Sequence, residues 1–228
     1  MKLLLASLAI LVTLAGCDRV AAGQAGHLIG QGLQQSYRLP RTPTVQVQGI
    51  PFLTQWASGR YREIDVHVDR LAIQGITVTD IAVRLEEVTT RSFVTSAREA
   101  AGATAATVSA EGLVPYAGLP LPPGLQLVPG PNGRLRLQGS LALGPATIPV
   151  AADLQVTIRD GAIELGLVDV QAVDPPLRAR ATLLLGSALS TVNGLQPAPL
   201  GLRLQSVQVR QDGLAVSAAG HQVPLTAA

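Results

Sequence analysis

The chain has 228 residues, with 17 Lys and Arg side chains against 15 Asp and Glu and a formal net charge of +2. This balance lacks the basic excess of nucleic-acid-binding proteins, so nucleic acid is excluded as an expected partner. Hydrophobic residues make up 47% of the chain and aromatic residues only 3%. A large aliphatic surface must therefore be buried, and the length suffices for one substantial core.

The N-terminus has the order of an export signal. Lys2 precedes an apolar run from Leu3 to Leu14, and Ala15-Gly16 then provides a small-residue cleavage site before Cys17. The run has about a dozen residues, whereas a helix needs about 20 to cross a bilayer. We therefore predict a lipoprotein-type signal peptide over residues 1–16. The alternative is an ordinary signal peptide followed by an incidental cysteine.

Cys17 is the only cysteine of the chain, and Leu14-Ala15-Gly16-Cys17 resembles the bacterial lipobox, in which the thiol is diacylated. Two acyl chains give stable anchoring where one gives only marginal binding. The sequence thus predicts an exported protein held by the lipid on Cys17 at the outer face of the cytoplasmic membrane, in the cell envelope. Acylation would leave no thiol for disulfides, zinc or nucleophilic chemistry.

The mature chain divides into a short N-terminal segment and one domain. Residues 17–36 are small, glycine-bearing and weakly periodic, which predicts a lipidated tether running into a short helix. Residues 37–228 are predicted to form a single domain. Alternation begins after Pro43, and one-sided alternation is typical of an antiparallel sheet. The alternating apolar positions are Val45 and Val47, then Ile64, Val66 and Val68, then Val78, Ile81, Val83 and Leu85.

The middle of the chain is less regular. Residues 97–107 are alanine-rich and fit a loop or a helix, and residues 109–113 predict a capped helical turn that ends near Pro115. The stretch 119–133 contains five prolines. It predicts a loop or an edge crossing, with an interdomain linker as the alternative.

Strand patterns return in the second half, over residues 135–143, 154–158 and 163–165. Asp160-Gly161 and Asp212-Gly213 each stand between alternating apolar runs, which is a strong hairpin signal. Between the two hairpins, residues 181–195 are the best helix candidate, ended by Asn193-Gly194.

Two segments resemble a known family. The turn Gly49-Ile50-Pro51-Phe52-Leu53-Thr54-Gln55, followed by Gly59-Arg60-Tyr61 and the Ile64-Asp65-Val66 strand, is similar to the LmeA-like phospholipid-binding family of actinobacterial cell envelopes. The ending, from Pro199 to Leu214, resembles that family's last strands. The resemblance implies an α+β, mainly β fold related to the bactericidal/permeability-increasing protein superfamily: a strongly twisted antiparallel sheet curled around one or two helices, with an apolar slot.

The resemblance also implies a function. It predicts a phospholipid or glycolipid partner with acyl chains in the slot, in support of envelope glycolipid or mannan synthesis or lipid transfer, with envelope biosynthetic enzymes as partners. No catalytic residue carries over, and no Gly-x-Ser-x-Gly, His-Glu-x-x-His or phosphate-loop motif occurs, so we expect neither an enzyme nor a cofactor. The alternative is an interaction or scaffold lipoprotein with a sealed core, which the alternation alone favours.

Candidate site residues follow from this hypothesis. The acyl-chain candidates are Phe52, Leu53, Trp56, Leu184 and Leu189. The aromatic pair lies at a predicted turn, where the competing interpretation is a plug at the end of the sheet.

Charged candidates are fewer. Arg134, Arg136 and Arg203 could clamp a lipid phosphate, although such arginines are more often simple surface charges. Asp65, His67 and Asp69 share one strand face, but a solvated face explains them better, so no metal is predicted.

Overall fold

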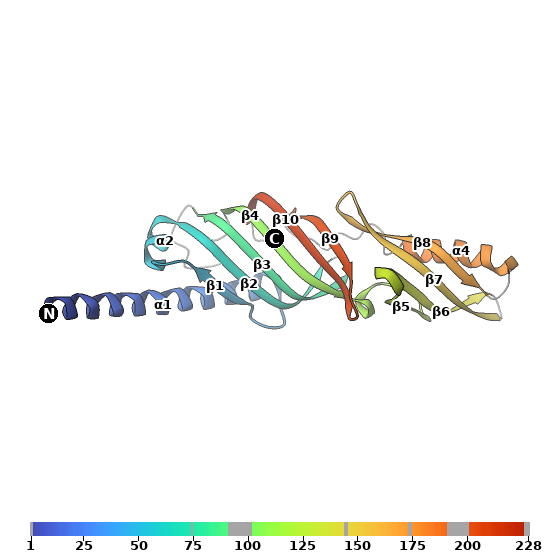
Figure 1. Cartoon of the computed structure of the whole chain (residues 1–228), viewed down its shortest axis with the longest axis horizontal. Helices are drawn as coiled ribbons and strands as arrows, with labels where there is room; N and C mark the ends of the chain where they lie inside the picture. The colour runs from blue at the N-terminus through green and yellow to red at the C-terminus, as the bar shows by residue number, and fades with distance from the viewer. Residues whose placement is uncertain are drawn as a thin grey trace. The chain divides into compact units, whose positions relative to one another are not determined.

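The structure, a computed structural model, describes residues 2–73, 75–90, 102–143, 146–172, 175–190 and 201–225. Within them the chain is mainly β, as the sequence predicts, with strands arranged in antiparallel sheets (Figure 1). The helices are α1 (Lys2–Tyr37), α2 (Phe52–Ser58), α4 (Pro175–Ser190) and the short 3-10 helices η1 (Tyr116–Gly118) and η2 (Pro131–Gly133). The strands are β1 (Thr44–Gln48), β2 (Arg60–Ile73), β3 (Ile76–Thr89), β4 (Ala103–Pro115), β5 (Leu125–Pro129), β6 (Leu135–Leu143), β7 (Ala146–Arg159), β8 (Ala162–Ala172), β9 (Arg203–Val209) and β10 (Gly213–Leu225).

The strands form two sheets where the sequence analysis expects one. The first has the order β1-β2-β3-β4-β10-β9, and the second has the order β5-β6-β7-β8. The proline-rich stretch after β4 leads from the first sheet into β5, an edge strand of the second sheet. Proline is tolerated on an edge strand because its missing N–H costs no ladder bond there. The prediction of an edge crossing in this stretch is therefore confirmed.

The chain forms two compact units, each assembled from several segments. Unit 1 comprises Met1–Arg70, Ile81–Ala110 and Ala219–Ala228, and unit 2 comprises Leu71–Asp80 and Glu111–Ala218. The chain passes between the units within the long strands β2, β3, β4 and β10, without an intervening linker. A single domain over residues 37–228 stays a prediction.

Strand β3 explains an irregular spacing in the sequence. Its buried residues Val78 and Ile81 are three positions apart, whereas strict alternation places same-face residues two apart. Asp80, between them, has a positive φ of 52°. One residue in the left-handed conformation is the geometry of a class of β-bulge, which inserts one residue and keeps the apolar set on one face.

The predicted helical turn at residues 109–113 is wrong, because this segment lies inside strand β4. β4 runs between β3 and β10 in the sheet. Its side chains Ala105 and Val108 are fully buried, so the pairing and packing of a central strand override the helix propensity of alanine. Residues 103–107 belong to the same strand, and residues 97–101 of the alanine-rich stretch lie outside the described residues.

Unit 2 confirms the first predicted hairpin. Arg159 pairs with Ala162 across Asp160-Gly161, and both turn residues have positive φ, as a two-residue hairpin turn requires. The second hairpin is also confirmed, because β9 and β10 are neighbours and the Arg210 N–H donates to the Gly213 carbonyl.

Helix α4 packs against β8, the other edge strand of the second sheet. Its buried residues Ala181, Leu185 and Leu189 are spaced four apart on one face. The helix begins at Pro175, earlier than the predicted residue 181. Proline suits the first helical turn, where its missing N–H removes no helical hydrogen bond. The predicted end at Asn193-Gly194 lies outside the described residues.

Helix α1 replaces the predicted tether. The helix continues without a break through residues 17–36 to Tyr37. The four glycines that favour a tether in the sequence occur within this helix, and two of them are explained by close contact with Val45 in β1 and with Pro43 just before it. The lipidation of Cys17 is a separate prediction and does not depend on the tether.

Candidate functional site

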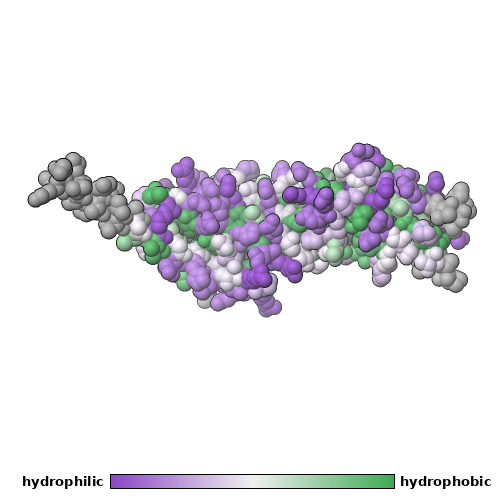
Figure 2. All heavy atoms as spheres, turned by 60° about the horizontal axis from the view of Figure 1, so that its bottom comes forward, coloured by the Kyte–Doolittle hydropathy of each residue, from purple (hydrophilic) through white to green (hydrophobic). Residues whose placement is uncertain are grey.

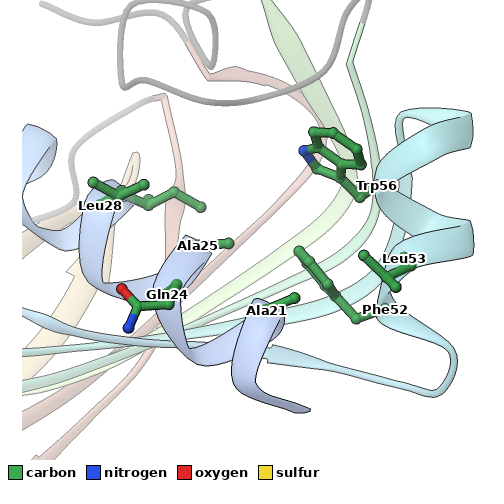
Figure 3. A pocket seen from close by; sticks show the side chains of 8 residues that line it. Ala21, Gln24, Ala25, Leu28, Phe52, Leu53 and Trp56 are labelled. Carbon is green, nitrogen blue, oxygen red and sulfur yellow. The ribbon is translucent and has the colours of Figure 1, made fainter. Parts of the chain in front are cut away.

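An apolar pocket of about 310 Å³ lies between α1 and α2 in unit 1. Every lining residue except Gln24 is apolar. Figure 3 shows Phe52 and Trp56 extending from α2 toward the side of α1 that carries Ala21 and Ala25. The lining residues are Ala21, Gln24, Ala25, Leu28, Ile29, Phe52, Leu53 and Trp56.

The α1 wall of the pocket is held in place by small residues. Gly26 and Gly30 are one helical turn apart; Gly26 lies directly against strand β1 and Gly30 against Pro43, the residue that precedes this strand. A Cβ at Gly26 would stand 2.3 Å from the Val45 carbonyl oxygen, and one at Gly30 would stand 2.6 Å from the Pro43 carbonyl oxygen. Only glycine permits this approach of helix and strand backbones. Because one face of α1 is used in this contact, the adjacent flank is free to line the pocket.

The α2 wall is fastened to α1 by a buried carboxylate. Asp18 on α1 is 4% exposed and accepts hydrogen bonds from the Phe52 N–H at 2.8 Å and the Leu53 N–H at 2.9 Å. The first N–H groups of a helix have no partner within the helix, and Pro51 at the N-cap position provides no side-chain cap. The Leu53 and Phe52 N–H groups lower the pKa of Asp18 below its ordinary 3.8.

Gln55 connects α2 to the sheet. Its side-chain amide donates to the Gln48 carbonyl at 3.1 Å and its side-chain oxygen accepts from the Arg62 N–H at 2.8 Å. It therefore bridges β1 and β2. Gly49, with φ of 95°, leaves room for this amide, because a Cβ there would lie 2.8 Å from the Gln55 nitrogen.

The remaining end of α2 is closed by Gly59, which caps the helix in the left-handed conformation with φ of 64°. Together with Gly49 and Gln55, it gives the conspicuous turn motif a structural role. The motif places a short aromatic helix at a fixed position beside the sheet.

Comparison with known proteins identifies the family. The LmeA-like phospholipid-binding family matches residues 16–219, most of the chain. The chain belongs to this family. The match includes both walls of the pocket and the whole turn motif. No curated protein and no solved structure gives a significant match.

In this family member, three of the five predicted acyl-chain residues line one pocket. Phe52 is 3% exposed and its ring centroid lies 6.5 Å from that of Tyr61, so it forms the floor and also plugs the core. Leu53 is 45% exposed and Trp56 is half-buried, so these two stand at the mouth. The two rings thus differ in burial, and a role of either in lipid binding stays a prediction.

The other two predicted acyl-chain residues lie on α4 in unit 2 and are not among the residues that line this pocket. Leu189 is 2% exposed and belongs to the core beneath the helix, whereas Leu184 is 39% exposed. Amphipathic spacing alone could not separate these two positions from pocket residues.

The three predicted headgroup arginines have different surroundings. Arg136 on β6 is bound to Asp153 on β7, with 2.8 Å between Nε and Oδ1. The hydrogen bond raises the pKa of Arg136 and lowers that of Asp153. Arg134 and Arg203 are exposed. Because the guanidinium of Arg136 is already engaged, Arg134 and Arg203 are the better placed of the three to meet an anion.

The polar stripe on β2 is engaged in ion pairs across the sheet surface. Asp65 accepts from Arg84 at 3.0 Å and Asp69 lies 2.9 Å from Arg41. His67 lies 3.9 Å from Asp69. These contacts agree with the interpretation of the stripe as a solvated strand face.

Sequence reasoning missed the α1 half of the site. Asp18, Ala22, Gly26 and Gly30 follow one another at intervals of four, which is the spacing of one helix face. That signal was present in the segment interpreted as a tether. Asp18 as the cap of α2 had no local signal, because its partners are 34 and 35 residues away.

No helix in the described part of the chain has both the length and the apolar character required to cross a bilayer.

Proposed function

We propose that this chain binds a phospholipid by taking part of an acyl chain into the pocket between α1 and α2. The observation that carries the proposal is an apolar pocket of about 310 Å³ in a member of a phospholipid-binding family. Acyl chains are flexible and make no directional contacts, so a smooth aliphatic lining suits them.

The pocket volume limits what is bound. Ligand pockets span about 300 to 1,000 Å³, and this one is at the lower limit. It accommodates part of one acyl chain, while the rest of the lipid and its headgroup stay outside. Gln24 is the single polar side chain of the lining, and it is available to hydrogen-bond the ester region of the lipid.

The energetics favour exchange with a membrane. Each methylene removed from water contributes about 0.8 kcal/mol, so the pocket opposes release of the chain into water. Transfer from a bilayer replaces one apolar environment with another and costs little. A pocket of this kind loads from a membrane and unloads to one.

The proposal extends to the location of the protein, which the N-terminal sequence pattern supports. The proposal includes cleavage before Cys17, diacylation of its thiol and retention at the outer face of the cytoplasmic membrane. There the protein would act as a non-catalytic binding module that supports envelope glycolipid or mannan synthesis or lipid transfer, in contact with the enzymes of that synthesis.

The pocket can be filled without disturbing the core. Ala25→Leu places a larger side chain into the pocket from α1 and retains a strong helix-forming residue. Ala82→Leu is the matched control, since Ala82 is exposed on β3 in unit 1 and does not line the pocket. Both variants are made with Cys17→Ser, delipidated, refolded, mixed with phosphatidylglycerol liposomes and examined by native mass spectrometry.

We expect phospholipid to be retained by the Ala82→Leu protein and lost by the Ala25→Leu protein, with both melting at the temperature of the parent. Equal retention of phospholipid by the two variants would show that this pocket is not the lipid-binding site. Absence of lipid from the parent would favour the scaffold alternative.

A further inference from the structure

Large apolar side chains are exposed beside the start of the mature chain. Ile50 is 72% exposed, Leu53 is 45% exposed and Val20 is 66% exposed. Ile50 precedes α2, Leu53 lies in its first turn, and Val20 lies three residues after Cys17 on α1. Figure 2 shows hydrophobic surface at the end of unit 1 that carries α2.

Hydrogen bonds from two neighbouring residues of α1 connect the segments that carry these side chains. Arg19, the neighbour of Val20, donates to the carbonyl of Gly49, the neighbour of Ile50, at 3.2 Å. Asp18 binds the Phe52 and Leu53 N–H groups. Both residues that follow Cys17 are therefore tied to the segment that carries Ile50 and Leu53, which leaves the exposed Cys17 one peptide unit from a fixed point.

Three observations indicate a bilayer as the occupant of this surface. The family binds phospholipid, and the pocket mouth at Leu53 and Trp56 adjoins the surface. The Arg19 guanidinium beside Ile50 complements anionic headgroups, since cationic side chains near a membrane surface are attracted to them.

We propose that Val20, Ile50 and Leu53 form a bilayer-docking surface that inserts into the interfacial region and holds the pocket mouth at the membrane. The inference rests on the proposed function for its ligand, and it adds a second membrane contact besides the acyl anchor. Apolar side chains of interfacial segments enter the membrane by about 5–10 Å.

A fluorescent probe can report this contact separately from the pocket. Trp56 is the only tryptophan, so Trp56→Phe gives a protein without tryptophan fluorescence. Ile50→Trp in that background places the probe on the docking surface and outside the pocket lining. Leu183→Trp is the matched control, because Leu183 is 75% exposed on α4 in unit 2.

The chain is expressed with its signal peptide so that it is cleaved and acylated at Cys17, and the purified lipoprotein is reconstituted in vesicles of phosphatidylcholine and phosphatidylglycerol with brominated acyl chains. We expect the Ile50→Trp probe to lose most of its emission and to be shielded from iodide. The Leu183→Trp probe should keep its emission and stay open to iodide. Adding Leu53→Asp should restore much of the Ile50→Trp emission.

An unquenched Ile50→Trp probe in vesicle-bound protein would overturn the proposal. Shielding that occurs in native membranes but not in pure lipid vesicles would indicate a protein partner and would also overturn it. If the Ile50→Trp probe is quenched but the native mass spectra show no retained lipid, the proposed lipid-binding pocket is contradicted and the docking surface is supported.

Discussion

Two helices of this chain lie against edge strands, and they use opposite kinds of residue to do so. α1 approaches β1 in unit 1 through Ala22, Gly26 and Gly30, while α4 packs on β8 in unit 2 through Leu185 and Leu189. The small residues bring backbones into contact, whereas the leucines fill the space beneath the helix.

The difference determines what each helix can do besides packing. α1 is fixed by one narrow face, so its neighbouring flank, with Ala21, Ala25 and Leu28, remains available to line a pocket. α4 uses its large apolar side chains to complete a core. The two kinds of packing therefore predict different harmful substitutions: removal of a large side chain in α4 and addition of a methyl group in α1.

The largest effect is expected in the leucine-packed helix. Leu185→Ala removes a fully buried side chain and should lower the free energy of unfolding by about 2–5 kcal/mol. Leu183→Ala on the exposed face should change it by no more than about 0.5 kcal/mol. Urea denaturation measures both, and lipid retention should survive both changes. A large loss from Leu183→Ala would mean that this face is covered.

In the glycine-packed helix, adding a single methyl should be harmful. Gly26→Ala forces α1 away from the Val45 carbonyl and should cost about 1–3 kcal/mol, as overpacking does. Gly23→Ala is the control, because its Cβ would meet nothing within 4 Å, and it should stabilise the helix by up to about 1 kcal/mol. If both variants shift the melting temperature in the same direction, close packing of α1 against the sheet would be contradicted.

The smallest effect concerns the fastening of α1 to α2 and depends on pH. The folded protein lowers the pKa of Asp18 below 3.8, so its stabilising contribution is present at neutral pH and disappears as the pH falls through the folded value. Asp18→Asn should melt a few degrees below the parent at neutral pH. The difference between the two melting temperatures should shrink below about pH 4. A difference that stays constant down to low pH would contradict this role of the carboxylate.

Much of the sheet was predictable because its signals are local. Val45 and Val47 alternate within β1, and Asp160-Gly161 adopts the turn that its residues favour. The two breaks in the alternation of β3 each coincide with one residue in the left-handed conformation, Asp80 and Glu87. β4 was not predictable in the same way, since its alanines favour a helix and become strand residues only between β3 and β10.

The site was half predictable for the same physical reason. Phe52, Leu53 and Trp56 are rare or bulky residues in a distinctive motif, so they were identified directly. Ala21 and Ala25 are ordinary helix residues whose importance arises from contact with a segment about 30 residues away. Glycines 26 and 30 favour flexibility in isolation, and only the proximity of β1 turns them into rigid packing positions.

The hydrogen bonds of Asp18 also limit how far the folded domain can move from its lipid anchor. If Cys17 carries the lipid, a single residue of free chain, about 3.5 Å when extended, separates the anchor from the folded body. The domain then cannot swing outward to collect or deliver a lipid at a distance. Its encounters with donors and acceptors would be a two-dimensional search by lateral diffusion, with rates set by membrane viscosity and by the surface density of its partners.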